Sequence, residues 1–238
     1  MKFNFLYILM LLACLVSCQT EVAQPEKGTG TLKLGMTRAG VASPLAIDED
    51  LALRILDSKG EVYVEYRAGS VPNKLILEPG TFTVIAYTDN QNSWSTQNNG
   101  RGAACYYGEC KVTIEFDQVV YVDMQVPMMN YAVTLTLPDL FHDLFKNYTF
   151  NVVCGERSVN IKENEKAYFA VSEKGFTYKL SATNTDNISH STTPLTYRKV
   201  ETGKLYNITY YYGTDANSGG VDIEITDDME IDDNDVSL

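Results

Sequence analysis

The chain has 238 residues, of which 31 are acidic and 19 basic, and its formal net charge is −12. A surface this acidic repels nucleic acids and anionic lipid headgroups, which argues against a nucleic-acid-binding role. The length allows one large β domain or two domains of about 100 residues each.

The N-terminus carries an export signal. Residues 5–16 form an apolar run of 12 residues behind Lys2. A membrane-spanning helix needs about 20 apolar residues, whereas the apolar core of a secretory signal needs about 7–15. The following Leu15-Val16-Ser17-Cys18 resembles a bacterial lipobox. We therefore expect a signal peptide over 1–17 and acyl chains such as palmitate on Cys18. Plain secretion and an uncleaved anchor are the alternatives.

A polar tether is expected over 18–29, and strand patterns follow it. Alternating apolar residues predict strands at 51–56, 61–66, 74–87, 111–116 and 119–126. The first two strands are joined by the turn sequence Asp57-Ser58-Lys59-Gly60, which predicts a hairpin, and the last two are expected to form another. Together these strands predict a β-sandwich over 28–127.

The second half repeats the strand-rich pattern with one interruption. A strand is predicted at 131–137, and residues 138–148 then change to a helical spacing. The apolar stripe of this short helix comprises Leu137, Leu140, Phe141, Leu144 and Phe145. Strand patterns resume afterwards and predict a second β-sandwich over 128–226. The acidic tail 227–238 is expected to be disordered. The fold class is thus all-β, with two tandem sandwiches and one short helix in the second.

Nothing in the sequence indicates an enzyme. It lacks a Gly-x-Ser-x-Gly elbow, a phosphate-binding loop, a His-Glu-x-x-His motif and a dinucleotide-binding glycine motif. His142 and His190 are the only histidines, so neither catalytic residues, a metal site nor a cofactor is expected. The acidic run 47–50 lacks the order of a calcium-binding loop and is interpreted as solvated charge. A pair of catalytic carboxylates is the one enzymatic alternative left open.

Two cysteines flank a turn-like stretch. Cys105 and Cys110 stand on either side of Tyr106-Tyr107-Gly108-Glu109, and an exported protein meets oxidising conditions. A disulfide between them is one alternative, and free thiols are the other.

The loop over 88–108 is the main candidate for ligand binding. It is long, polar and rich in glycine, and it contains the only tryptophan of the chain. An aromatic face flanked by amide side chains resembles a sugar-binding surface. The alternatives are that the tryptophan caps the sandwich or lies at a mobile tip. The candidate ligand-binding residues are Asn92, Trp94, Gln97, Tyr106 and Tyr107.

Several stretches resemble a known family. They include GTGTLKLGM (28–36), LILEPGTFTVIAYT (75–88), the Tyr-x-Gly turn at 106–108 and VETGKLYNITY (200–210). In their order and spacing the chain is similar to a family of Bacteroidetes outer-membrane lipoproteins that carries a domain of unknown function. That family is allied to the fimbrillin-like subunits of type V pili.

The resemblance implies two transthyretin-like Greek-key sandwiches and a lipid-anchored, surface-exposed location at the outer membrane. It also implies adhesion, or an accessory or anchor role in a fimbrillin-like fibre. The expected partners are pilus-like subunits, host or bacterial surface proteins, or glycans. In such pilins a protease cuts after an arginine behind the first strand, and Arg38 is the matching position. The alternative function is a glycan-binding lipoprotein of a carbohydrate-uptake system.

Overall fold

The computed structural model describes residues 28–39, 46–211 and 220–226. The predicted signal peptide, the lipidation site Cys18, most of the tether and the acidic tail lie outside the described residues. Within the part that is described, no helix is both long enough and apolar enough to cross a membrane.

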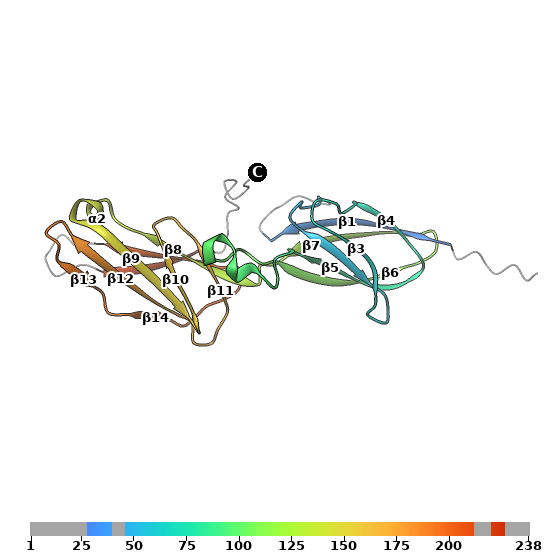
Figure 1. Cartoon of the computed structure of the whole chain (residues 1–238). Coiled ribbons are helices and arrows are strands. Elements are labelled where there is room, and N and C mark those ends of the chain that lie inside the picture. Colours follow the sequence, from blue (N-terminus) through green and yellow to red (C-terminus); the bar gives the residue numbers. More distant parts are fainter. Residues whose placement is uncertain (1–27, 40–45, 212–219, 227–238) are drawn as a thin grey trace, which may run out of the picture.

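The first half of the chain forms a sandwich of two sheets (Figure 1). Its strands are β1 (Gly30–Arg38), β2 (Ala52–Leu56), β3 (Val62–Tyr66), β4 (Lys74–Leu77), β5 (Gly80–Tyr87), β6 (Tyr107–Ile114) and β7 (Val119–Val126). One sheet has the order β4-β1-β7, and the other has the order β3-β2-β5-β6.

The second half forms another two-sheet sandwich. Its elements are β8 (Asn130–Thr136), α2 (Asp139–Leu144), β9 (Phe145–Cys154), β10 (Arg157–Ile161), β11 (Ala167–Ala170), β12 (Phe176–Asn184), β13 (Ser189–Ser191), β14 (Leu195–Tyr197), β15 (Leu205–Tyr211) and β16 (Gly220–Thr226). The sheet orders are β11-β8-β15-β16 and β10-β9-β12-β13, and β14 also pairs with β12. The all-β class with one short helix in the second half is therefore confirmed, whereas the Greek-key detail stays a prediction.

The two sandwiches share one topology, although the sequence shows no convincing internal repeat. In each, the first strand lies between the fourth strand, to which it is antiparallel, and a late strand, to which it is parallel. In each, the second strand pairs with the third and the fifth. The second sandwich adds β16 beside β15. The repeat therefore lies in the order of pairing rather than in the residues.

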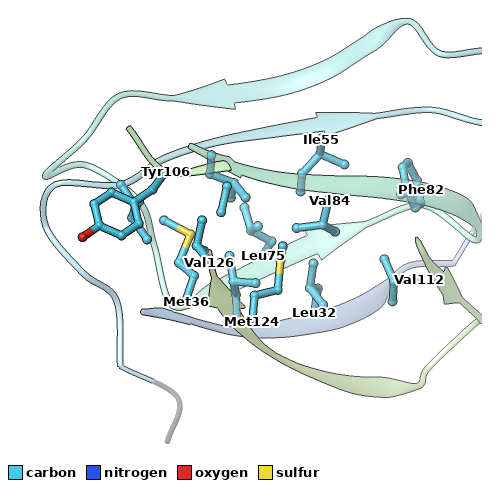
Figure 2. Close-up of a cluster of buried hydrophobic side chains, with 14 of the residues drawn as sticks. Leu32, Met36, Ile55, Leu75, Phe82, Val84, Tyr106, Val112, Met124 and Val126 are labelled. Carbon is cyan, nitrogen blue, oxygen red and sulfur yellow. The ribbon is translucent and has the colours of Figure 1, made fainter. Parts of the chain in front are cut away.

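Alternation of apolar residues explains the first core. Leu53 and Ile55 of β2 and Val84 of β5 are fully buried, and each such side chain contributes roughly 1.5–3 kcal/mol. Figure 2 shows the core between the sheets, with Tyr106 at one end beside Met36 and its hydroxyl pointing away from the other labelled side chains.

The second core is mainly aromatic. The Tyr131 ring centroid lies 5.8 Å from that of Phe169, 5.9 Å from that of Phe176 and 5.5 Å from that of Tyr206. Such offset and edge-on pairs add about 0.5–1.5 kcal/mol each beyond their buried area.

Two details of the sequence-based expectation were wrong. β6 and β7 do not form a hairpin, because β6 pairs with β5 while β7 crosses to the other sheet and runs parallel to β1. The helix is also shorter than expected and ends at Leu144, because the next residue begins β9. Of the predicted stripe, Leu140 and Leu144 remain 51% and 43% exposed, so only part of it packs on the core.

Candidate binding site at the junction of the two sandwiches

The loop between β5 and β6 folds onto the junction of the two sandwiches. It contains two short 3-10 helical turns, η2 (Trp94–Thr96) and η3 (Asn98–Gly100), which lie between the sandwiches in Figure 1. Asn90 organises the loop from within. Its side-chain nitrogen donates to the Ala104 carbonyl at 2.9 Å, and its own carbonyl accepts the backbone N–H of Trp94 at 2.7 Å. The loop is therefore held by its own polar groups.

Arg157, the first residue of β10, attaches the second sandwich to this loop. Its guanidinium donates to the carbonyls of Ser95 at 2.6 Å and Gly100 at 2.7 Å. It also lies 5.6 Å from the ring centroids of both Trp94 and Phe169. Burial lowers the pKa of this guanidinium. The Trp94 ring is thus engaged by a cation and packs against the first core.

Further contacts join the loop to the second sandwich. Arg101 pairs with Glu165 at 2.9 Å, and the Arg101 carbonyl accepts the Tyr168 backbone N–H at 2.8 Å. The buried Asn130 side chain donates to the Ala103 carbonyl at 2.8 Å. Because buried polar groups are costly when unpaired, these bonds favour one fixed arrangement of loop and sandwich.

Gly102 allows the close approach at this junction. Its φ of +87° lies in the left-handed region, which favours glycine. A Cβ there would stand 3.1 Å from an Arg157 nitrogen and 3.3 Å from the Trp94 carbonyl oxygen. A side chain would therefore disturb the contact between the loop and β10.

Arg38 lies on the other side of the loop. Arg38, the position that matches the cleavage site of the pilins, is the last residue of β1, and its side chain is 20% exposed. It pairs with Asp48 at 2.7 Å and Asp50 at 3.1 Å, and it lies 5.6 Å from the Tyr106 ring centroid. Burial opposes its charge, but the bond to Asp48 and the two carboxylates outweigh burial and raise the pKa of Arg38.

A polar hollow of about 460 Å³ opens between Arg38 and the loop. This volume lies within the roughly 300–1,000 Å³ of small-molecule sites. Tyr168 of β11 contributes to the lining, so residues of both sandwiches meet here. The polar residues of the lining include Arg38, Asp50, Asp89, Ser93, Gln97 and Asn98.

The structure separates the five candidate ligand residues. Gln97 and Tyr106 line the hollow, whereas Asn92, Trp94 and Tyr107 do not. Asn92 is exposed, and the Tyr107 hydroxyl donates to Glu109 at 2.7 Å. Ligand binding by this set stays a prediction.

Sequence reasoning missed several lining residues. Asp50 belongs to the acidic run that was interpreted as solvated charge, and Asp89 lies in the candidate loop but is not an amide. Tyr168 carried no signal at all, because it is far from the loop in sequence.

The disulfide alternative is not present, because Cys105 and Cys110 are both free thiols. Cys110 lies within β6, and Cys105 lies just before this strand. Tyr106, between them, forms an isolated antiparallel β-bridge with Met128. Five residues of extended chain span about 16 Å, more than the roughly 7 Å that a disulfide tolerates between Cα atoms. Burial raises the pKa of both thiols.

The chain matches one protein family by sequence and several solved structures by fold. Residues 26–237 match the family described as domain of unknown function, DUF4493. No curated protein matches the chain. The chain is similar to a candidate cell adhesion protein of Bacteroides eggerthii, with 11% identity, a TM-score of 0.50 and coverage of 84% of this chain and 95% of that one. A candidate cell adhesion protein of Bacteroides uniformis has 10% identity, a TM-score of 0.50 and coverage of 86% and 99%.

The tip fimbrial protein Mfa3 of Porphyromonas gingivalis, truncated at its C-terminus, is similar at 9% identity and a TM-score of 0.49, with coverage of 83% of this chain and 99% of that one. At such low identity, the likeness to the two Bacteroides proteins concerns the fold alone.

Proposed function

The chain belongs to the family described as domain of unknown function, DUF4493, and we propose that it is a non-enzymatic, lipid-anchored protein of the outer membrane that acts in adhesion. It would serve either as a standalone adhesin or as an accessory or anchor subunit of a fimbrillin-like fibre. Both similar solved structures with TM-scores of 0.50 are described as candidate cell adhesion proteins, which supports this proposal.

The observation that carries the proposal is the bonded, end-to-end arrangement of the two sandwiches. The described chain begins at the end of the first sandwich that lies furthest from the second (Figure 1). Arg157 and Arg101 join the sandwiches through bonds of 2.6–2.9 Å. A chain anchored through Cys18 would therefore hold its second sandwich away from the membrane, where it can meet a partner.

Lipid attachment and location are tested in cells. A Bacteroides host that produces the full chain is labelled with a palmitate analogue and compared with the variant Cys18→Ala. Label on the chain, loss of label in the variant, and digestion of the chain by protease added to whole cells would support a surface lipoprotein. Unlabelled chain, or chain protected from protease until the cells are broken, would contradict it.

Adhesion is tested in the same host. A strain that lacks the gene is expected to bind less well to epithelial cells or to other bacteria, and the restored gene is expected to recover binding. Equal binding by both strains would contradict the adhesive role.

Whether the chain is cleaved after Arg38 distinguishes two roles, an anchor protein and a subunit that exchanges strands. A cut after Arg38 would release β1, the central strand of the sheet β4-β1-β7, and so open a groove for a neighbour's strand. The N-terminus of the chain taken from cells decides the matter. A start at Cys18 supports the anchor or standalone role, and a start at Ala39 supports a strand-exchanging subunit.

The alternative function is a glycan-binding lipoprotein of a carbohydrate-uptake system, and the polar hollow favours it. The same gene deletion tests this alternative, because growth on a glycan would then decline while adhesion would not.

A further inference from the structure

We propose that the hollow bounded by Arg38 and the loop between β5 and β6 binds an uncharged oligosaccharide through hydrogen bonds to Asp89, Gln97 and Asn98. This inference deepens the proposed function, on which it rests for its biological role, because it names the contact through which the protein would adhere.

The loop leaves both a donor and an acceptor open toward the hollow. The Gln97 side-chain oxygen accepts the Asn90 amide at 3.3 Å, so its NH₂ group remains to donate. The Asn98 amide donates to the Gly102 carbonyl at 2.9 Å, so its oxygen remains to accept. Each hydroxyl of a sugar can donate and accept at once, and it therefore matches such a mixed lining.

Carboxylates extend the set of acceptors. Asp89 is exposed and forms no ion pair within the described parts of the chain. Asp50 contacts Arg38 through one carboxylate oxygen, Oδ2, and its other oxygen can accept a further hydrogen bond. Hydrogen bonds to charged groups are stronger than those between neutral groups. Two carboxylates in one lining can therefore hold hydroxyl groups that a purely neutral lining would hold weakly.

The charge of the hollow selects the class of sugar. Among the described residues that line the hollow, Arg38 is the only cation, and it is already paired with Asp48 and Asp50. Asp89 then leaves the region with an excess of negative charge. A sugar acid or a phosphate would meet repulsion without a free cation to offset it, so an anionic sugar is disfavoured.

The wall also offers apolar surface. Ala103, Ala104 and Tyr106 contribute to the lining and can contact the C–H faces of a sugar ring. Tyr168 adds to this wall from the second sandwich, and Arg157 holds the loop from the same side. The hollow is thus organised before any ligand enters, which reduces the entropic cost of binding.

The test uses the lipidated chain in a zwitterionic detergent, because sugar-based detergents would compete. The probes are mannobiose, xylobiose, maltotriose and N-acetyllactosamine, with digalacturonic acid and an oligolysine peptide as charged probes. We expect an uncharged probe to bind. We also expect binding to shift the fluorescence emission of Trp94, because the preceding residue, Ser93, lines the hollow. Binding of no uncharged probe, or stronger binding of a charged one, would overturn the inference.

Matched variants locate the site. Gln97→Ala and Asp89→Ala are each expected to weaken binding about tenfold, because each removes one hydrogen bond to the sugar. Gln125→Ala and Asp123→Ala remove the same side chains from exposed positions of β7 and are expected to leave binding unchanged. Equal losses in both pairs would show that the sugar binds elsewhere.

The adhesion assay separates this site from the proposed function. If no sugar binds but the deletion strain loses adhesion, the site is wrong and the adhesive role stands. If a sugar binds but the deletion strain adheres normally, the site stands and the adhesive role is wrong.

Discussion

The guanidinium of Arg157 in the second sandwich lies 5.6 Å from the ring centroid of Trp94 in the first. A cation over an aromatic face contributes about 0.5–2 kcal/mol. From the sequence, Trp94 resembles an exposed platform for a sugar ring. In the structure, it instead connects the first sandwich to Arg157 of the second. Its ring helps to fix the loop from which the hollow is built.

Replacing Arg157 by alanine should loosen the junction. The change removes three hydrogen bonds from a cation to backbone carbonyls, two of them to the loop, so the free energy of unfolding should fall by about 2–3 kcal/mol. Urea denaturation followed by Trp94 fluorescence measures the loss, and small-angle scattering reports the spread of angles between the sandwiches.

Arg54 provides the matched control. It also lies near an aromatic ring, 5.1 Å from the Tyr87 centroid, and pairs with Glu65 on the exposed face of the first sandwich. Arg54→Ala should cost less than about 1 kcal/mol, because exposed ion pairs contribute little. If the two variants lost the same stability, Arg157 would have no special role at the junction.

Gly102 and Gly100 offer a comparison within one loop. Both have left-handed φ values, +87° and +83°, but a Cβ at Gly100 would meet nothing within 4 Å. Gly100→Ala should therefore cost only backbone strain, about 1 kcal/mol, whereas Gly102→Ala should cost about 1–2 kcal/mol more because of crowding against Arg157. Thermal and urea unfolding measure both losses. If both variants lost the same free energy of unfolding, the Arg157 side chain would move aside for the added methyl group at no cost in stability.

Two neighbouring tyrosines should respond differently to loss of the hydroxyl. Among the described residues, the buried Tyr131 hydroxyl has only the weakly polar Cys154 thiol to interact with, so Tyr131→Phe should be neutral or slightly stabilising. The Tyr206 hydroxyl accepts the Glu201 N–H at 2.8 Å and donates to the Lys199 carbonyl at 3.2 Å. Tyr206→Phe should therefore cost about 1–2 kcal/mol. A clear loss in Tyr131→Phe would reveal a partner for that hydroxyl.

Stability should decline in alkali. Burial raises the pKa of Tyr210 to about 12, and burial with the bond to Glu65 raises that of Tyr87 to about 12. Above the ordinary tyrosine pKa of about 10, the unfolded chain loses protons that the folded chain keeps, so the free energy of unfolding falls as pH rises toward about 12. Melting temperatures at about pH 8 and about pH 11 test this, with tyrosinate absorbance as a second signal. An unchanged melting temperature would contradict it.

Much of the fold could be predicted because strand alternation is local. Leu53, Ile55 and Val84 lie on inward faces as their spacing predicts, and the hairpin of β2 and β3 forms around Asp57-Ser58-Lys59-Gly60. The partner of a strand is not local. Nothing in residues 119–126 distinguishes a hairpin with β6 from the parallel pairing with β1 that the structure contains.

By itself, the sequence determined the all-β class and, by its charge, the kinds of partner that the protein repels. It also placed a long polar loop between two strands. The tertiary structure alone decided that this loop closes onto the second sandwich, that Trp94 serves the junction, and that Asp50, Asp89 and Tyr168 share one hollow. The physical reason is that alternation and turn chemistry act over a few neighbouring residues, whereas a junction depends on groups far apart in the chain. Arg157 and Gly100 are such a pair, and only folding brings them to 2.7 Å.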